Sequence, residues 1–352
     1  MVLILTLALA GCATRPGVEL LQPVAVQAPA GARTVTVLTA TTRSDPADYG
    51  AGRGSAMGFV RYDISIPPGH VPAQIEWPGR TPPDPEKHFV TTAREGLDRR
   101  AFAARIRAQG GAGIFVHGYN HSHQEALFRA AQMAADSRIP GDPILFSWPS
   151  GARLGDYLGD QDAADSARSA LAELLILSAE ASPRPVMLMA HSMGGRLTME
   201  ALRQLALQGR RDVLDRLEVV LVAPDLDVDM FREQTRIIGR MRQPIAVLAA
   251  TDDRALIVSS RISAGSRRMG GLDVRDPATT ALAAETGVLI VDISAIPADS
   301  IGHDRYARLT GILSDLEEHR PQSLMGGVQQ TGTFVFDTVG VTLQRMGQAI
   351  AE

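Results

Sequence analysis

The chain has 352 residues, of which 45% are hydrophobic and 21% charged, and it carries a formal net charge of −4. This length and composition suit one large α/β domain with a substantial core better than two independent domains. The slightly acidic balance excludes the basic footprint of a nucleic-acid-binding protein. A single cysteine excludes a disulfide bond within the chain.

The chain opens with an apolar segment, residues 1–11, which ends in Leu9-Ala10-Gly11 directly before Cys12. This segment is too short to span a bilayer. Cys12 has three interpretations: a buried bystander, a free thiol, or the lipid-acceptor residue of a bacterial lipoprotein signal. The sequence around it resembles a lipobox, so we expect lipid attachment at Cys12. Such an anchor predicts a membrane lipoprotein of the bacterial cell envelope, on the periplasmic face of the outer membrane.

Two further regions follow the signal segment. Residues 12–33 are rich in Pro, Ala, Gly and Gln, and they predict a flexible tether. Residues 34–352 are expected to form a single domain. Three segments separated by Pro- and Gly-rich loops predict its antiparallel opening strands. These are Thr34 to Thr39, Gly58 to Ile66 and His88 to Thr92.

From Gly113 onward, apolar strand patterns alternate with helical patterns. This alternation predicts a mostly parallel central sheet with helices on both faces. Ser122 and Glu125 have the spacing of a capping box at one helix start. The segment from Phe334 to Ile350 is expected to be a docking helix or a late strand. The predicted helices are His123 to Ser137, Ser166 to Glu180, Met193 to Gln208 and His303 to Glu318.

The most informative motif is Ala190-His191-Ser192-Met193-Gly194, which lies between an apolar run and a helical pattern. A strand, a tight turn and a helix in that order raise a serine hydroxyl above the edge of a sheet. Small residues two places on either side let neighbouring backbones approach closely. The first of these is Ala190, where glycine is usual. The motif predicts that Ser192 is a catalytic nucleophile.

Two partners for this serine follow later strands. Asp253 comes directly after the apolar run Ile245 to Ala250, and His303 follows the run Val288 to Ile293. A serine hydroxyl needs an imidazole that takes its proton, and a carboxylate must orient that imidazole. The sequence therefore predicts the triad Ser192, Asp253 and His303. Asp225 and Asp227, which follow the run Val219 to Val222, remain alternative acids.

An oxyanion hole is expected at the end of the strand Gly113 to Val116, which runs into His117-Gly118-Tyr119-Asn120. Acyl transfer places negative charge on the former carbonyl oxygen, and backbone N–H donors aimed at that oxygen stabilise it. We assign the two donors to the residue after the nucleophile and the residue after the His-Gly pair. These are Met193 and Tyr119.

Taken together, the motifs resemble a bacterial, lipoprotein-type serine hydrolase branch of the α/β-hydrolase superfamily. The resemblance is carried by FVHGYN, LFSWPSG, AHSMGG, APDLD, DDRAL and the late GH, over a region from about Arg43 to about Leu316. It implies the α/β-hydrolase fold with Ser192, Asp253 and His303 as the triad. Members of this superfamily have many different activities, so the fold alone does not choose the substrate.

Several side chains carry a second interpretation. His117, His121 and His123 could be read as metal ligands, but partners at matching spacing are missing, so we expect no metal and no cofactor. Asp225, Asp227 and Asp229 alternate as in a calcium loop, yet the glycine and glutamate that such a loop requires are absent. Trp148 and Tyr157 are read either as the lining of an acyl pocket or as plain packing.

The function favoured by the sequence is a serine hydrolase, a carboxylic ester hydrolase of the esterase or lipase type. Its expected substrate is a small-molecule or lipid-like ester, and its expected partner is the membrane, reached through the anchor. Two alternatives stay open. The first is a non-catalytic binding or scaffold protein of the envelope on the same fold, and the second is a metallohydrolase that uses the histidine cluster. The sequence does not indicate an oligomeric state.

Overall fold

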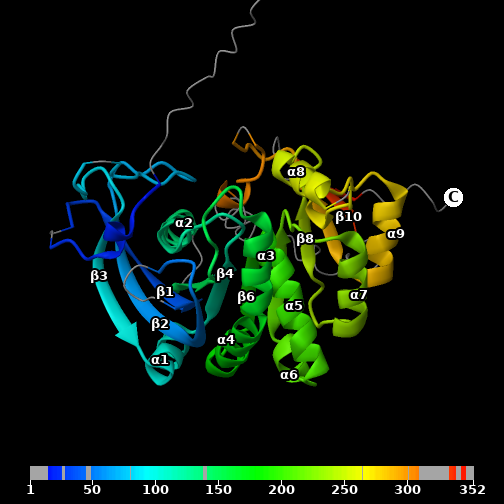
Figure 1. The fold of residues 1–352 in the computed structure, drawn as a ribbon, viewed down its shortest axis with the longest axis horizontal. Helices are drawn as coiled ribbons and strands as arrows, with labels where there is room; N and C mark the ends of the chain where they lie inside the picture. Colours follow the sequence, from blue (N-terminus) through cyan, green and yellow to red (C-terminus); the bar gives the residue numbers. More distant parts are fainter. Residues whose placement is uncertain are drawn as a thin grey trace, which may run out of the picture.

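One sheet organises the structure, a computed structural model that describes residues 15–25, 28–44, 49–79, 81–137, 141–263, 265–299, 301–308, 333–337 and 342–345. Within these residues the sheet has 11 strands in the order β11-β10-β9-β8-β7-β6-β4-β5-β1-β2-β3 (Figure 1). The strands are β1 (Arg33–Arg43), β2 (Arg53–Ile66), β3 (Val90–Leu97), β4 (Ala112–Val116), β5 (Pro143–Ser147), β6 (Val186–His191), β7 (Leu217–Val222), β8 (Ala246–Ala249), β9 (Leu289–Asp292), β10 (Thr333–Asp337) and β11 (Thr342–Arg345).

From β10 to β1 in this spatial order, neighbouring strands pair in parallel. The sheet is antiparallel at both edges. At one edge β1, β2 and β3 pair antiparallel, and at the other β10 pairs antiparallel with β11. Parallel pairing places the carboxyl ends of the central strands along a single edge of the sheet. The loops that follow β4, β5, β6, β7, β8 and β9 therefore meet at that edge (Figure 1).

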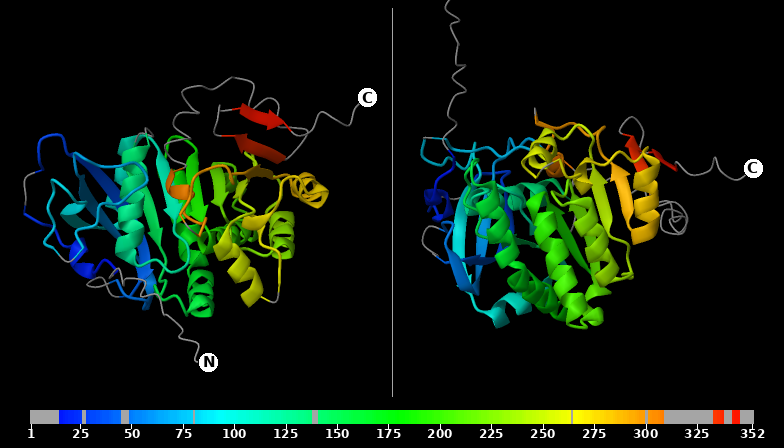
Figure 2. Two further views of the ribbon diagram at one scale, coloured as in Figure 1. Left: turned by 90° about the horizontal axis from the view of Figure 1, so that it is seen from above. Right: turned by 45° about the vertical axis from the view of Figure 1, so that its right-hand side comes forward.

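Helices cover both faces of the sheet (Figure 2). One hydrophobic core draws its helical residues from α1, α3, α4, α5, α6, α7 and α9. The other core, on the opposite side of the strands, draws its helical residues from α2 and the short helix η1 and also contains Tyr306. The helices are η1 (Val18–Leu21), α1 (Arg99–Gln109), α2 (His123–Asp136), α3 (Tyr157–Ser166), α4 (Arg168–Ala181), α5 (Met193–Leu207), α6 (Arg211–Leu214), α7 (Val228–Ile238), α8 (Arg254–Ile262), η2 (Met269–Gly271) and α9 (Pro277–Thr286).

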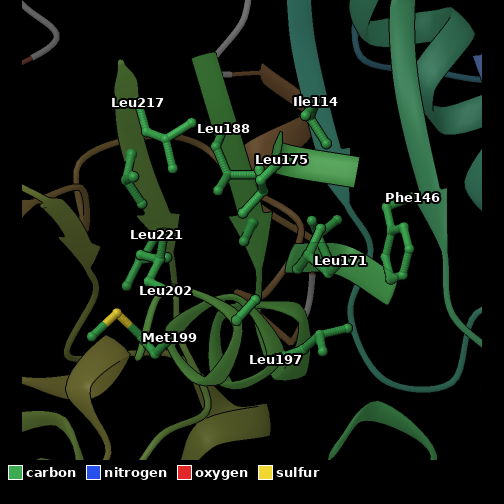
Figure 3. Close-up of a cluster of buried hydrophobic side chains, with 14 of the residues drawn as sticks. Ile114, Phe146, Leu171, Leu175, Leu188, Leu197, Met199, Leu202, Leu217 and Leu221 are labelled. Atoms are coloured by element: carbon green, nitrogen blue, oxygen red, sulfur yellow. The ribbon is translucent and has the colours of Figure 1, made fainter. Parts of the chain in front are cut away.

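Helix α5 is held against the central strands by the hydrophobic core that it shares with α4, β6 and β7. Leucine and methionine side chains of α5 face leucine side chains of α4 and of the strands β6 and β7 (Figure 3). These positions recur at helical spacing on α5, so one face of the helix is apolar. Burial of each such side chain contributes about 1.5–3 kcal/mol relative to exposure. The labelled α5 members, Leu197, Met199 and Leu202, are each 0% exposed.

The fold prediction is confirmed: the chain has a mostly parallel sheet with helices on both faces and antiparallel N-terminal strands. The predicted opening strands were too short, because β1 and β2 pair from Arg33 opposite Ile66 to Arg43 opposite Arg53. The capping box is also present, with Ser122 accepting from the backbone N–H of Glu125. The helices α1, α3, α6, α7, α8 and α9 were not predicted.

Part of the segment predicted as a tether contacts the domain. Leu20 and Leu21 of η1 are buried and pack in the core beside α2. The backbone N–H of Val24 also donates to the carbonyl oxygen of Thr91, at 2.9 Å. The two leucines explain the difference, because a segment with adjacent large apolar residues gains free energy when it covers an apolar face.

The C-terminal predictions have mixed outcomes. The late strand expected within Phe334 to Ile350 exists as β10 and β11, and β10 pairs in parallel with β9. The helix predicted from His303 to Glu318 lies mostly outside the described residues, as do the signal segment and Cys12. Within the described part of the chain, no helix is both long and apolar enough to cross a membrane.

Candidate active site

Ser192 lies on a strained turn between β6 and α5. Its backbone has φ 54° and ψ −122°, a conformation that residues with a side chain rarely adopt. The strain is held by hydrogen bonds on both sides: the Ser192 N–H donates to Val222 O at 3.0 Å, and the Ser192 carbonyl accepts from the N–H of Gly195 and of Asp225. The hydroxyl is therefore presented above the carboxyl ends of β6 and β7, at the start of a helix.

The glycines after Ser192 are required by close packing. A Cβ atom on Gly194 would lie 2.5 Å from the carbonyl oxygen of His117 and 2.6 Å from that of Val116. A Cβ atom on Gly195 would lie 2.9 Å from Cβ of Pro224. The start of α5 thus sits directly against the ends of the neighbouring strands, which fixes the height of the serine.

Substitution Gly194→Ala is expected to push α5 away from β4, because backbone carbonyls cannot retreat as a flexible side chain can. Overpacking of this kind costs about 1–3 kcal/mol of unfolding free energy. The matched control is Gly111→Ala, where a Cβ atom would meet nothing within 4 Å. Urea unfolding of both variants tests this. Equal stability of Gly194→Ala and the parent chain would contradict the packing argument.

Asp253 and His303 form a direct pair. Nδ1 of His303 donates to Oδ2 of Asp253 at 2.6 Å. Oδ1 of Asp253 accepts from the backbone N–H of Leu256 at 3.1 Å, so the same carboxylate caps the start of α8. The carboxylate is 1% exposed, and both of its oxygens are satisfied. This pairing leaves Nε2 of the neutral imidazole as its proton acceptor.

The loop that carries His303 is held from two sides. The N–H of Arg254, the first residue of α8, donates to Ile301 O at 2.9 Å. The Asp299 carboxylate accepts from the backbone N–H groups of Ile301, Gly302 and His303. These contacts orient the histidine backbone relative to Asp253, because they tie its loop to the helix that Asp253 caps.

His191, the residue before the serine, connects the serine turn to the histidine loop. Its Nε2 donates to the carbonyl oxygen of His303 at 3.0 Å, and the two rings have centroids 4.5 Å apart. The His191 ring also stacks on the ring of Tyr306, with centroids 4.0 Å apart. Among the described residues, no hydrogen bond reaches the Ser192 hydroxyl. The structure thus brings the Asp253–His303 pair beside the serine turn, with His191 as the link.

The two backbone donors assigned to the oxyanion hole lie at the same turn. A Cβ atom on Gly118 would be 3.0 Å from Cβ of Ser192, so the loop after β4 passes very close to the serine. Met193 is the first residue of α5, where an N–H has no partner within the helix. Within the described chain, neither the Met193 N–H nor the Tyr119 N–H donates to another residue.

The alternative acids have other partners. Asp225 accepts from the Tyr157 hydroxyl at 2.8 Å and pairs with Arg268, both carboxylate and guanidinium being almost fully buried. Asp227 accepts from the backbone N–H groups of Asp229 and Met230 and thereby caps α7. The geometry therefore associates His303 with Asp253 rather than with either alternative.

The histidine cluster after β4 is part of the core. His123 donates or accepts at Ser147 Oγ, at 2.9 Å, and stacks on Tyr49. His117 stacks on Trp148, whose indole N–H donates to His117 O at 2.8 Å. In the part of the chain that the structure describes, no group of three or more His, Cys, Asp or Glu residues could hold a metal ion.

The His123–Ser147 contact is a second Ser–His pair, but its surroundings differ. The Ser147 hydroxyl also accepts from Nε of Arg43, at 3.2 Å, and both the serine and the histidine are 0% exposed. Burial and the Arg43 charge lower the pKa of His123 well below its usual value. A base needs an orienting carboxylate and access to substrate, and this pair has a buried cation beside it instead.

Tyr157 belongs to the buried polar cluster beside Asp225. Burial, with a contribution from Asp225, raises the pKa of Tyr157 to about 12, so its hydroxyl stays protonated and donates. Its ring makes an edge contact with Tyr119 at 5.5 Å. Trp148 is 0% exposed, which favours packing over the lining of an acyl pocket.

Acid is expected to destabilise the fold through His117, His123 and His191. Burial is the largest cause that lowers the pKa of each of these imidazoles well below its usual value. Below about pH 6.5 the unfolded chain binds protons that the folded chain does not, so stability falls as pH falls, by about 1.4 kcal/mol per pH unit for each histidine. Urea unfolding at a series of pH values measures this slope. In the variant His123→Asn, the slope of unfolding free energy against pH should be smaller by the contribution of one histidine. An unchanged slope would contradict the view that His123 is buried in its neutral form.

Sequence reasoning missed two residues at this site. His191 is visible in the serine motif, but its contact with the His303 loop joins residues that are far apart in the chain. Arg15 lies in the segment predicted as a tether, yet it donates to the side chains of Asn120 and Glu125, each at 3.0 Å. It also donates to the backbone oxygens of Asn120 and Ala152. The N-terminal segment therefore reaches the loop after β4, which carries Tyr119, and no local pattern indicates this contact.

Known structures resemble this architecture at low identity. The chain is similar to the esterase Est22 in a structure with p-nitrophenol, at 10% identity and a TM-score of 0.39, over 82% of this chain and 81% of that chain. It is similar to fungal esterases from Rhizomucor miehei, at 10% identity and a TM-score of 0.38, over 81% and 84%. A putative carboxylesterase from Lactobacillus plantarum WCFS1 matches at 15% identity and a TM-score of 0.38, over 60% and 91%.

The family follows from a match to the sequence itself. A search of curated proteins gives no significant match. The family model described as alpha/beta hydrolase of unknown function (DUF900) matches residues 98–320, which include the serine turn, Asp253 and His303. Because this match spans more than half of the chain, the protein belongs to that family of α/β-hydrolases.

Proposed function

We propose that this protein is a serine esterase that works through an acyl-enzyme. The Ser192 oxygen attacks the carbonyl carbon of an ester, and its proton passes to Nε2 of His303. Asp253 holds the imidazole by its Nδ1–H and stabilises the imidazolium. The backbone N–H groups of Met193 and Tyr119 donate to the oxygen that becomes negatively charged; loss of such a donor costs about 3–4 kcal/mol of transition-state stabilisation.

The second half of the reaction regenerates the enzyme. The C–O bond of the ester breaks, and the imidazolium gives its proton to the departing alcohol. A water molecule then attacks the acyl carbon and gives a proton to Nε2 of His303. The bond from the acyl carbon to Ser192 breaks, the serine takes the proton back, and a carboxylic acid leaves.

The observation that carries this proposal is the position of the Asp253–His303 pair at the strained serine turn. The pair has a 2.6 Å hydrogen bond, and the His303 ring lies 4.5 Å from the ring of His191, the residue before Ser192. A backbone strain such as that at Ser192 is retained where it serves a function. Catalytic hydrogen bonds are often long before substrate binds, so the serine–histidine contact is expected to form with substrate.

A fluorophosphonate probe tests the proposal, because it forms a covalent bond with an activated serine. We expect labelling of the full chain, and peptide mass spectrometry should place the adduct on Ser192. Labelling at another serine, or none with a properly folded sample, would favour the alternative of a non-catalytic binding protein. Loss of turnover with a chelator would instead favour a metallohydrolase.

The proposal includes anchoring in the bacterial envelope through a lipid on Cys12, with the enzyme on the periplasmic face of the outer membrane. The support is the Leu9-Ala10-Gly11-Cys12 sequence after an apolar run. Incorporation of labelled palmitate in bacterial cells is expected for the parent chain and should be lost in Cys12→Ala. Labelling that persists in Cys12→Ala would remove the anchor, and the esterase proposal would be unaffected.

A further inference from the structure

Helix α8 exposes three of its four large apolar side chains instead of burying them. Ile257, Val258 and Ile262 are 44%, 54% and 54% exposed, whereas the buried residues of α8 are Leu256 and Ser259. Surface helices ordinarily bury such side chains and expose polar ones. The outward face of α8 also carries exposed arginines at the same helical spacing. Its members are Arg254, Ile257, Val258, Arg261 and Ile262.

Other exposed apolar side chains lie in two segments that contact this helix. Leu154 is 83% exposed, Leu158 is 65% exposed and Ile301 is 49% exposed. Ile301 accepts from the N–H of Arg254 at 2.9 Å, and Tyr157, the neighbour of Leu158, meets Ser259 of α8 at 3.0 Å. We name this set the apolar rim. It consists of Leu154, Leu158, Ile257, Val258, Ile262 and Ile301.

The apolar rim lies next to the candidate active site. Asp253 caps α8, and the hydroxyl of Tyr119 donates to the carbonyl oxygen of Leu154 at 2.6 Å. Both α8 and the loop before α3 follow central strands, so they lie at the carboxyl edge of the sheet, where Figure 1 shows α8 above β8. Exposed apolar side chains that gather around a site mark an interaction surface.

The N-terminal segment identifies the occupant of this surface. Arg15 lies against Asn120 and Ala152, next to the loop that carries Leu154. Residues 1–14 lie outside the described chain, and their sequence is an apolar run followed by Cys12. The chain from residue 12 to residue 15 spans about 10 Å at most. A lipid on Cys12 would therefore hold the apolar rim close to the membrane surface.

We propose that the apolar rim is a membrane-docking face whose occupant is an anionic lipid surface. Isoleucine, valine and leucine side chains enter the boundary between headgroups and acyl chains, while Arg254 and Arg261 meet the phosphate groups. The face adjoins the site through Asp253 and Tyr119, so the esters presented to Ser192 are acyl esters carried by that surface. This last step rests on the proposed esterase function, whereas the docking itself does not.

Vesicle sedimentation tests the docking face with the full chain carrying Cys12→Ala, which removes the proposed acyl acceptor. The vesicles contain phosphatidylethanolamine with a minority of phosphatidylglycerol. The double variant Ile257→Ser and Ile262→Ser is expected to bind about tenfold more weakly. The matched control is Val71→Ser with Leu207→Ser, two residues 47% and 64% exposed outside the rim. It should bind within about twofold of its parent. Circular dichroism melting verifies that both variants fold.

Equal binding by the rim variant and its parent would overturn the proposal. Concentration-dependent self-association that the rim substitutions abolish, seen by sedimentation velocity, would make a second copy of the chain the occupant and would also overturn it. Ser192→Ala separates docking from catalysis, because it should bind vesicles as the parent does. If Ser192→Ala retains full ester turnover, the esterase proposal fails while docking stands. Turnover of an ester carried in vesicles is compared with turnover of a soluble ester, in the rim variant and in the parent. If the ratio of the two rates is the same in both proteins, the assignment of membrane-borne esters as substrates fails.

Discussion

Substitution Ser192→Ala is expected to lower kcat for a short soluble ester by at least about 10⁴-fold, with little change in KM. The expected loss is large because no other group can form the acyl-enzyme, and what remains is the catalysis due to the oxyanion donors and binding. Steady-state kinetics with a chromogenic ester measures it. A kcat within tenfold of the parent value would remove Ser192 from the mechanism.

A second variant at the same position separates chemistry from folding. Ser192→Gly removes the hydroxyl and also relieves the backbone strain, since glycine adopts φ 54° without steric cost. We therefore expect an inactive protein that is about 1 kcal/mol more stable than the parent. An inactive but more stable variant would indicate that the turn is maintained for catalysis at the expense of stability.

Substitution Asp253→Asn is expected to lower kcat by about 10⁴-fold, because an amide holds the imidazole in the wrong tautomer. The buried Asp253 carboxylate accepts two hydrogen bonds, from His303 and from the Leu256 N–H. Neither bond comes from an arginine or a lysine. The amide oxygen can still accept from that N–H. The stability loss should therefore be small, and pH-dependent kinetics together with urea unfolding should reveal a defect in catalysis rather than in folding.

Asp225→Asn is the matched control, since Asp225 is the alternative acid. Its carboxylate pairs with the buried Arg268 guanidinium, so the substitution leaves a buried charge without compensation. Loss of one member of such a pair costs about 3–5 kcal/mol of stability. The two variants should thus show opposite patterns. A large loss of kcat in a folded Asp225→Asn protein, with normal turnover by Asp253→Asn, would reverse the assignment of the acid.

The sequence predicted the elements of the site that depend on strand ends. Ser192, Asp253 and His303 each follow an apolar strand, and parallel strands bring their carboxyl ends to a common edge. The same rule applied to Asp225, which follows β7, so strand order alone left the acid open. Only the side-chain contacts separate the two: Asp253 meets His303, and Asp225 meets Arg268.

Other features could not be predicted because they depend on contacts between distant segments. The periodicity of α8 is that of any amphipathic helix, and it does not reveal that Ile257 and Ile262 face outward. The contact of Arg15 with Asn120 joins the N-terminal segment to the loop after β4. The metal interpretation of the three histidines arose from their spacing, whereas burial and ring stacking account for His117 and His123.

Asp253 is at once the cap of α8 and the partner of His303. If a lipid surface shifts the position of this helix, it also shifts Asp253 and thereby the orientation of the His303 imidazole. Thermodynamic linkage makes such a coupling reciprocal. A boronic acid that binds the serine reversibly is then expected to bind more tightly on vesicles, by the same factor as it strengthens the adhesion of the protein to them.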